Sequence, residues 1–305
     1  MRAVQVAQFG VEYVRFAEAA DPAPGAGEVL IRTEAATINP ADLGIVTGAA
    51  VPRFPPGTAA PYTPGWDLAG LVVSRGEGTD PALAGARVVG FTIWFVTGHG
   101  TQASFVALPA SNVVVAPEGL PSTQLTTVGL NGLTAWRGLA DLNLTAGETL
   151  VVTGAAGGVG GFAVELAVAR GLAVIAVVRP GAEDEALELG ASAAVGSPAA
   201  VRKMTSAGAD ALLDTASLGQ PALSAVRDGG RYVSVTTVPA PERSISVTRS
   251  YGRMDTEGLT TLVEMATSGR LHTPVARVFD AAHVRQAYEH FRTHHGRGRT
   301  VLSFT

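Results

Sequence analysis

The sequence contains no cysteine. Disulfides, cysteine-ligated zinc sites, cysteine nucleophiles and redox CxxC motifs are therefore excluded. Charged residues are also sparse, at 16%, and the formal net charge is only −4. So small a negative charge provides no general attraction to nucleic acid or to an anionic membrane surface. We therefore expect neither of these as a partner.

Long uninterrupted hydrophobic runs are absent as well. The most apolar region, residues 149–178, is broken by glycines and by Glu165 and Arg170. A membrane-spanning helix needs about 20 consecutive apolar residues. The first ten residues, MRAVQVAQFG, lack the apolar core of a signal peptide. These features predict a soluble cytoplasmic protein.

Apolar residues are nevertheless abundant, at 47% of 305 residues, and the length is typical of two domains. In the first third, short apolar runs alternate with glycine and proline, which indicates a twisted, barrel-like β domain. The expected strands are residues 28–38, 68–76, 86–95 and 103–109. The proline-rich segment 48–65 has two open interpretations, a stiff connector or a lid at the rim of a pocket.

From about residue 120 the pattern changes to strands that alternate with helices, which predicts βαβ units and a parallel sheet. The expected strands are residues 149–154, 172–178, 210–217 and 231–237, and the expected helices are 157–171, 183–190 and 221–230. The C-terminal part continues with helices at 256–269 and 281–295 and strands at 274–279 and 299–304. The fold class is therefore α/β, a Rossmann-type doubly wound parallel sheet plus a β domain.

The densest group of glycines lies where the first strand of this sheet meets its helix. Gly154, Gly157, Gly158, Gly160 and Gly161 separate the apolar run TLVVT from a helical pattern. Backbone N–H groups at such a helix N-terminus bind anions, and the helix dipole favours negative charge. The pattern A-x-G-x-x-G, in this strand-to-helix context, predicts a dinucleotide site. We expect Gly157 to make the sharp turn, Gly158 to admit the pyrophosphate, and Gly160 to let the helix pack close to its strand.

The end of the second strand of the sheet indicates which dinucleotide binds. NAD sites place Asp or Glu there for the ribose 2′-hydroxyl, whereas NADP sites lose that carboxylate and gain a cation. Here the strand ends in Val-Val-Arg179, and no acidic residue follows until Glu183. We therefore expect NADPH as the cofactor, with Arg179 on its 2′-phosphate. An ordinary surface arginine is the alternative for Arg179.

Several short motifs occur together in a fixed order. They are NPAD (39–42), PGWDLAG (64–70), GLNGLTAWRGL (129–139), TGAAGGVGG (153–161) and GRGRTVL (296–302). With them, the chain resembles the medium-chain dehydrogenase/reductase superfamily, in particular its zinc-free quinone oxidoreductase and enoyl reductase branch. The resemblance implies a GroES-like catalytic domain from residues 1–120 and 255–305, an NADP-binding Rossmann domain from residues 121–254, and a homodimer.

The resemblance also bears on a catalytic metal. In zinc-dependent relatives three residues of these motifs hold the metal, and the corresponding residues here are Asn39, Trp66 and Asn131. None of these side chains is a suitable zinc ligand in such a site. We therefore expect no metal. His290 and His294 are four residues apart on an expected helix, a spacing that can bind a metal, but a solvated helix end is the simpler interpretation.

The resemblance assigns residues to the cofactor by motif position. Asn39, Asn131 and Thr134 are expected near the nicotinamide ribose or the phosphates, and the turn residues line the pyrophosphate. The remaining expected contacts follow the strands of the sheet. The cofactor-binding set is Asn131, Thr134, Gly154, Ala156, Gly157, Gly158, Val159, Arg179, Thr215, Ala216, Val235 and Thr236.

Without a metal, hydride transfer from NADPH requires an electron-poor acceptor, such as a quinone or an α,β-unsaturated carbonyl compound. An enone gains most from a proton donor, whereas a hydroquinone anion can be protonated by water. The candidate catalytic residues are Asn39, Asp42 and Tyr62. For Tyr62 packing under the loop is the alternative, and for Asp42 a structural hydrogen bond. His99 is a further proton-donor candidate, with a turn histidine as the simpler interpretation.

The function predicted from the sequence is an NADPH-dependent, zinc-independent reductase of a small electrophilic molecule, either a quinone or an activated alkene. One alternative is a substrate-specific enoyl reductase of a secondary-metabolite pathway. Another is a non-catalytic NADPH-binding sensor or structural protein, because a fold does not fix a function. Phe54, Trp94 and Phe95 are candidates for an apolar pocket wall, although core packing explains each equally well.

Overall fold

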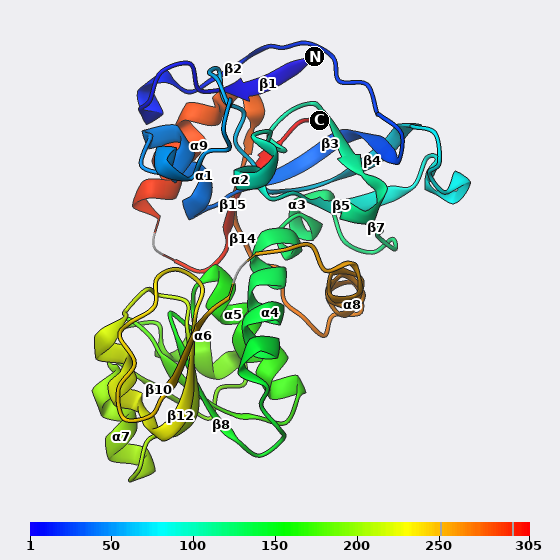
Figure 1. The fold of residues 1–305 in the computed structure, drawn as a ribbon. Helices are drawn as coiled ribbons and strands as arrows, with labels where there is room; N and C mark the ends of the chain where they lie inside the picture. Colours follow the sequence, from blue (N-terminus) through cyan, green and yellow to red (C-terminus); the bar gives the residue numbers. More distant parts are fainter. Residues whose placement is uncertain (251, 295) are drawn as a thin grey trace. The chain divides into compact units, whose positions relative to one another are not determined.

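The computed structural model describes residues 1–250, 252–294 and 296–305 (Figure 1). The chain forms two compact units, one from Met1–Leu130 with Arg253–Thr305 and the other from Asn131–Gly252. The boundary predicted from the sequence lies ten residues earlier, at 120/121. Residues 121–130 lie in the first unit because the Ser122 hydroxyl donates to Glu34 at 2.7 Å and the Leu130 N–H donates to Asp67 at 3.1 Å.

In the described part of the first unit, seven strands form one sheet with the order β14-β15-β3-β4-β5-β7, and β6 also pairs with β3. The strands are β3 (Glu28–Ile38), β4 (Asp67–Arg75), β5 (Arg87–Phe91), β6 (Phe105–Pro109), β7 (Val113–Val115), β14 (Val275–Asp280) and β15 (Arg299–Ser303). A separate antiparallel pair joins β1 (Arg2–Gln5) to β2 (Arg15–Glu18). The C-terminal segment therefore completes the sheet that the N-terminal segment begins.

Strand β3 is the centre of this sheet, because it pairs with β4, β6 and β15. Its buried residues pack with those of its neighbours into two apolar clusters, one around Val29 and Leu68 and the other around Ile38 and Tyr288. The helices of this unit are α1 (Pro40–Thr47), α2 (Trp94–Thr97), α3 (Ser122–Leu125), α8 (Thr256–Thr267) and α9 (Val284–Thr293).

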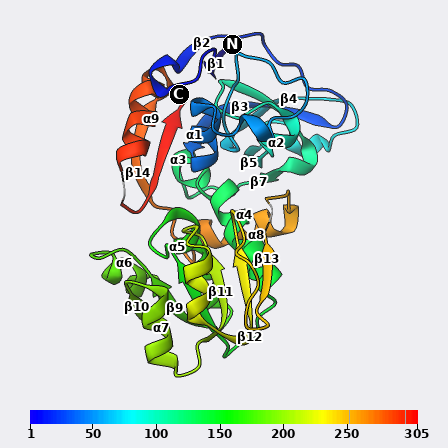
Figure 2. The same cartoon turned by 60° about the vertical axis from the view of Figure 1, so that its left-hand side comes forward.

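In the described part of the second unit, six strands form a sheet with the order β10-β9-β8-β11-β12-β13, and every pair is parallel (Figure 2). The strands are β8 (Thr149–Thr153), β9 (Ala173–Val177), β10 (Ala193–Val195), β11 (Ala209–Asp214), β12 (Val226–Ser234) and β13 (Ser246–Arg249). The chain runs outward from β8 to β10 and then returns to the other side of β8. Ligands bind at such a reversal, at the carboxyl ends of the strands.

Helices cover both faces of this sheet. They are α4 (Leu133–Leu142), α5 (Gly158–Ala169), α6 (Glu183–Glu188) and α7 (Pro198–Thr205). A Cβ on Gly138 of α4 would lie 2.7 Å from Leu213, whereas Val201 of α7 packs in one cluster with Leu212. Since consecutive strand residues point to opposite faces, the predicted doubly wound parallel sheet is confirmed. None of the described helices is long and apolar enough to cross a membrane.

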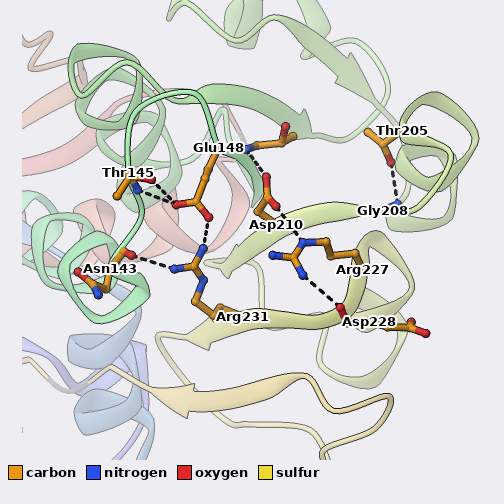
Figure 3. Close-up of polar contacts among 10 residues, drawn as sticks. Asn143, Thr145, Glu148, Thr205, Gly208, Asp210, Arg227, Asp228 and Arg231 are labelled. Atoms are coloured by element: carbon orange, nitrogen blue, oxygen red, sulfur yellow. Dashed lines mark hydrogen bonds and ion pairs between the residues drawn. The ribbon is translucent and has the colours of Figure 1, made fainter.

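The amino ends of the strands are joined by paired charges (Figure 3). Asp210 accepts from the Thr149 N–H at 2.8 Å and pairs with Arg227 at 2.9 Å, while Glu148 pairs with Arg231. Hydrogen bonds and these arginines lower the pKa of both carboxyls despite partial burial. The contacts link β8, β11 and β12 at the edge opposite the glycine-rich turn.

Two elements differ from the sequence prediction. The predicted strand 86–95 ends at Phe91, and Trp94–Thr97 form helix α2, which closes at Gly98 in the left-handed conformation. The predicted helix 221–230 is a 3₁₀ helix over Gln220–Ala225, because β12 already begins at Val226. A distorted register in β12, where Ala209 pairs with Val226 but Ala211 with Arg231, separates the two parts of that strand. His295, the end of the predicted helix 281–295, lies outside the described residues.

The close approach of α5 to β8 depends on one glycine. A Cβ on Gly160 would lie 2.1 Å from the carbonyl oxygen of Gly154, a distance that no real Cβ contact has. The prediction that Gly160 lets the helix pack close to its strand is therefore confirmed. Gly161, the next residue of the helix, is different, because the nearest atom to its Cβ would be Leu189 Cδ1 at 3.5 Å.

These two glycines provide a matched test of the packing. Gly160→Ala should lower the free energy of unfolding by about 2 kcal/mol, because α5 must shift away from the turn. Gly161→Ala should leave it unchanged or raise it by up to about 1 kcal/mol through helix propensity. Urea unfolding followed by circular dichroism measures both. Equal losses in the two variants would contradict the close packing at Gly160.

Candidate functional site

The glycine-rich turn joins the carboxyl end of β8 to the first turn of α5. The Gly154 N–H donates to Val177 of β9 at 2.8 Å, and the Gly157 N–H donates to Gly154 at 2.8 Å. The left-handed residue of the turn is Gly154, with φ +62°, whereas Gly157 has φ −82° and caps the helix. The expectation that Gly157 makes the sharp turn is therefore wrong, because the positive φ occurs three residues earlier.

The first turn of α5 provides backbone donors. A helix leaves its first N–H groups without a partner inside the helix, and here that turn contains Gly158, Val159 and Gly160 and no acidic side chain. Together with the dipole of a twelve-residue helix, these groups favour an anion. The turn therefore has the donors and the small side chains that a pyrophosphate requires.

A buried carboxylate at the end of β11 holds the neighbouring loop. Asp214 is fully buried and accepts hydrogen bonds from the hydroxyls of Thr153 and Tyr232, at 2.6 and 2.5 Å. It also accepts from the backbone N–H groups of Leu218 and Gly219, at 3.1 and 2.9 Å. Buried carboxylates need such donors. Asp214 thus ties together the carboxyl ends of three adjacent strands and fixes residues 215–219.

The residues expected around the cofactor lie along this same edge. Thr215 donates to the Thr153 carbonyl at 2.6 Å, and the Ala216 N–H donates to the Thr153 hydroxyl at 3.1 Å. A Cβ on Gly154 would lie 3.1 Å from the Ala216 side chain, so the loop and the glycine turn are in contact. Thr236, just after β12, shares a hydrogen bond of 2.7 Å with Ser217.

Four further residues of the expected cofactor set also lie in the second unit, namely Arg179, Val235, Asn131 and Thr134. Arg179 is exposed two residues after β9, next to Val178, whose N–H donates to Val195 at 3.0 Å. Val235 follows β12 directly, and its N–H donates to the backbone carbonyl of Asp214 at 3.3 Å. Asn131 is buried in a π-helical turn, Val128–Gly132, and Thr134 is half-buried in the first turn of α4.

Sequence reasoning missed Thr153, Asp214 and Tyr232. A signal for Asp214 exists, since a carboxylate ends an apolar strand at the edge where parallel strands bind ligands. Thr153 and Tyr232 carry no comparable signal, because their task depends on hydrogen bonds to a residue 61 and 18 positions away.

In the first unit, Asp42 serves the backbone. It is fully buried, and its two carboxylate oxygens accept from the N–H groups of Asn39 at 2.8 Å and Gly65 at 2.7 Å. Asn39 is also fully buried and donates to the Thr37 hydroxyl at 2.8 Å. The geometry supports the structural interpretation of Asp42, which fastens the start of α1 to the end of the proline-rich segment.

A second buried carboxylate, Asp67, joins segments that are far apart in the sequence. It accepts from the N–H and the hydroxyl of Thr37, at 3.1 and 2.5 Å, and from the Leu130 N–H. Burial raises the pKa of Asp67, although hydrogen bonds and the Arg299 charge oppose this. Burial lowers the pKa of Arg299 to about 10. The two opposite charges offset part of each other's desolvation cost.

Tyr62 belongs to an aromatic cluster. Its ring stacks on Phe9 at 5.8 Å and meets the edges of Phe54 at 5.0 Å and Trp94 at 6.4 Å. Its backbone pairs with Val6 in both directions. These contacts support the packing interpretation of Tyr62. They also show that the proline-rich segment packs against the unit through Phe54 and Tyr62, as more than a connector.

The histidines singled out in the sequence are apart from these groups. His99 is exposed and uses its backbone to bond Thr97. The rings of His290 and His294 stack at 5.0 Å, and His290 Nδ1 lies 3.1 Å from the Thr300 hydroxyl. Burial and the two neighbouring positive groups, His294 and Arg277, lower the pKa of His290. Within the described ranges, no three or more His, Asp or Glu side chains are grouped to hold a metal ion.

Two protein families match parts of the chain. The family described as "Alcohol dehydrogenase GroES-like domain" matches residues 25–118, and the family described as "Zinc-binding dehydrogenase" matches residues 189–302. The chain belongs to the medium-chain dehydrogenase/reductase superfamily. The predicted GroES-like domain and Rossmann-type sheet are thereby confirmed. Among the proteins that this chain resembles are a quinone oxidoreductase and a solved structure described as an NAD-dependent alcohol dehydrogenase.

The curated relatives include quinone oxidoreductases and alcohol dehydrogenases. A quinone oxidoreductase from Rattus norvegicus is 38% identical over 57% of this chain and 52% of its own length. An alcohol dehydrogenase from Moraxella sp. is 29% identical over 76% of each chain. This chain spans only about half the length of the rat quinone oxidoreductase.

Solved structures of the superfamily extend the similarity to the whole chain. A thermostable alcohol dehydrogenase from Pyrobaculum aerophilum has a TM-score of 0.85 at 28% identity and covers 99% of both chains. The quinone oxidoreductase from Coxiella burnetii has a TM-score of 0.89 at 23% identity, covers 100% of this chain and 99% of its own, and shows the same fold.

The buried Asp42 makes a testable contribution to stability. Burial raises its pKa from 3.8 to about 8, and the two N–H donors oppose this. Because the pKa of Asp42 is higher in the folded state than in the unfolded state, protonation of Asp42 stabilises the fold. This contribution is complete below pH 3.8 and is lost as pH rises through about 8. The free energy of unfolding should therefore fall between pH 5 and 8, by at most about 1.4 kcal/mol per pH unit.

The variant Asp42→Asn provides the comparison. Its amide cannot titrate, and the amide NH₂ group faces one of the two backbone N–H groups that Asp42 binds. Its free energy of unfolding should be lower by about 1–3 kcal/mol at pH 5 and should vary less with pH than that of the wild type. Urea unfolding at pH 5, 6.5 and 8 measures both quantities. Since Asp67 remains in both proteins, identical pH slopes would refute the titration of Asp42.

Proposed function

We propose that this chain is an NADPH-dependent, zinc-independent oxidoreductase that reduces a quinone or an α,β-unsaturated carbonyl compound. The observation that carries the cofactor assignment is the carboxyl edge of the second sheet. There the glycine turn ends β8, and Arg179, with no carboxylate beside it in the sequence, follows the adjacent β9. The quinone oxidoreductase relatives support the acceptor class.

The residues of this edge fit a dinucleotide. The turn consists of small residues, from Gly154 through Ala155 and Ala156 to Gly158, and Gly160 brings the helix close to the strand. In the proposal, the pyrophosphate lies on the turn from Gly154 to Val159. When bound, the reduced dinucleotide supplies the acceptor with a hydride, which is two electrons and one proton, and leaves oxidised.

The remaining expected residues would position the two ends of the cofactor. In the proposal Arg179 binds the 2′-phosphate, and residues 215–216, 235–236, Asn131 and Thr134 surround the nicotinamide ribose. Asp214 does not touch the cofactor but holds residues 215–219 in place through its hydrogen bonds. It is thus a positioning residue.

The contacts of the candidate acids favour a quinone over an enone. Both oxygens of Asp42 already accept backbone hydrogen bonds, and Tyr62 packs among aromatic rings. Because Asp42 and Tyr62 are engaged in these contacts, the proton that follows the hydride comes most simply from water. A hydroquinone anion is stable enough to wait for that proton, whereas an enolate benefits from a dedicated acid.

The choice of NADPH over NADH is tested at Arg179. Arg179→Ala should weaken NADPH binding about 10–100-fold, which corresponds to one charge-assisted contact, and should leave NADH binding unchanged. Arg202→Ala is the matched control, because Arg202 lies in α7 and faces Asp228 at 4.0 Å. Titration calorimetry measures both cofactors in each protein. Equal losses for NADPH and NADH would remove Arg179 from the phosphate site.

The reaction class is tested with the purified, metal-stripped protein. NADPH should be consumed with a para-quinone, more slowly with a simple enone, and more slowly again when NADH replaces NADPH. The absorbance of the reduced nicotinamide reports turnover directly. Tight NADPH binding without reduction of either acceptor would contradict the proposed reaction and would favour a non-catalytic role.

A further inference from the structure

One buried hydrogen-bond donor of the first unit has no acceptor. The side chain of Trp66 is buried, with 5% exposure, and its indole Nε1 lacks a hydrogen-bond partner among the described residues. Buried polar atoms in folded proteins are nearly always paired, so each exception requires an explanation. An indole N–H can only donate, so its missing partner is an acceptor atom.

Two other buried aromatic donors of the unit are paired. Trp94, the other tryptophan of the aromatic cluster, donates its indole N–H to the Thr63 carbonyl at 2.8 Å. The buried Tyr288 hydroxyl donates to Gln102 at 2.8 Å. Trp66 differs from these two aromatic donors, and within the described ranges Thr33 and His294 each have one unpaired buried atom as well.

The backbone around Trp66 is fixed. Its carbonyl accepts from the Thr92 N–H at 2.8 Å, and the next residue, Asp67, opens β4. The preceding Gly65 has φ +119° and donates to Asp42, and a Cβ there would lie 2.5 Å from the Thr101 nitrogen. These contacts fix the main chain on both sides of Trp66, at the position where its buried indole N–H has no acceptor in the part of the chain that the structure describes.

The rings around Trp66 indicate what kind of molecule brings the acceptor. Phe95 of α2 meets the Trp66 ring edge-on at 5.0 Å and is itself only half-buried. The Arg53 guanidinium lies 3.8 Å from the centre of the Phe95 ring. Trp94 adjoins Phe95 at 5.8 Å. An aromatic wall with a cation at its outer side favours a flat, apolar molecule with an electron-rich oxygen.

We propose that the Trp66 Nε1–H binds the carbonyl oxygen of the acceptor. This inference rests on the proposed function, because it names the group that recognises a quinone or enone at the oxygen that gains negative charge on reduction. A donor aimed at the atom where charge develops stabilises the reduced product more than the acceptor. The ligand reaches the indole by displacing the half-buried Phe95.

The direct test observes the indole proton. The chain has three tryptophans, so ¹⁵N-tryptophan labelling gives three indole signals, and Trp66→Phe identifies that of Trp66. With oxidised NADP bound, so that no turnover occurs, 1,4-naphthoquinone should move the Trp66 signal downfield. Naphthalene, which has the same rings without the oxygens, should not produce that shift. The Trp94 N–H, already bonded to Thr63, is the internal control.

The absence of cysteine excludes thiol addition to the quinone as a cause of any shift. A Trp66 signal that stays unmoved by naphthoquinone, or that moves equally with naphthalene, overturns the inference. The readout does not require turnover. A shift without NADPH consumption therefore leaves the Trp66 site standing and removes the proposed reaction, whereas turnover without a shift removes the Trp66 site alone.

Kinetics provide the second readout. Trp66→Phe retains a flat ring and loses only the donor, so kcat/KM for a quinone should fall about 10–100-fold, as for one lost hydrogen bond, while the Kd for NADPH is unchanged. Trp136→Phe is the matched control, because Trp136 lies in the other unit with Arg170 at 4.8 Å from its ring. An unaltered kcat/KM in Trp66→Phe, with the fold intact by circular dichroism, overturns the inference.

Discussion

Each unit is organised around a fully buried aspartate that must be surrounded by donors. A carboxylate removed from water is costly unless hydrogen bonds replace the water, so the segments that supply them are held in place. Asp67 draws Thr37 and Leu130 to the start of β4. Asp214 draws Thr153 and Gly219 to the end of β11. The loops that carry the proposed chemistry are therefore fixed by electrostatics as much as by apolar packing.

The same constraint limits which groups remain for catalysis. The buried side chain of Asp42, whose two oxygens both accept backbone N–H groups, is committed to the fold. A tyrosine stacked between rings, as Tyr62 is, serves the core. The chain retains donors, the N–H groups of α5 and the indole of Trp66. A set of donors without a committed acid suits the reduction of an acceptor whose product needs only water for its last proton.

Local sequence patterns predicted some features of the second unit correctly and others wrongly. Gly160 could be assigned from the motif, since spacing within one turn sets the contact between α5 and the Gly154 carbonyl. Gly157 was assigned wrongly, because several glycines adjoin and only the folded backbone shows that Gly154 takes the positive φ. The helix expected at 221–230 was shortened to a 3₁₀ turn, because pairing with β11 draws residues from Val226 onward into the sheet.

Local sequence alone was enough to predict the alternation of strands and helices, the glycine turn between β8 and α5, and the place of Arg179 after β9. Those features depend on residues close together in the chain, where the period of apolar residues and the conformational freedom of glycine are decisive. The folded structure was needed to see that Asp42 bonds the backbone, that Asp214 holds a loop and that the Trp66 indole has no acceptor among the described residues. Each of these depends on which distant donor or acceptor reaches a buried atom, and no local pattern records that.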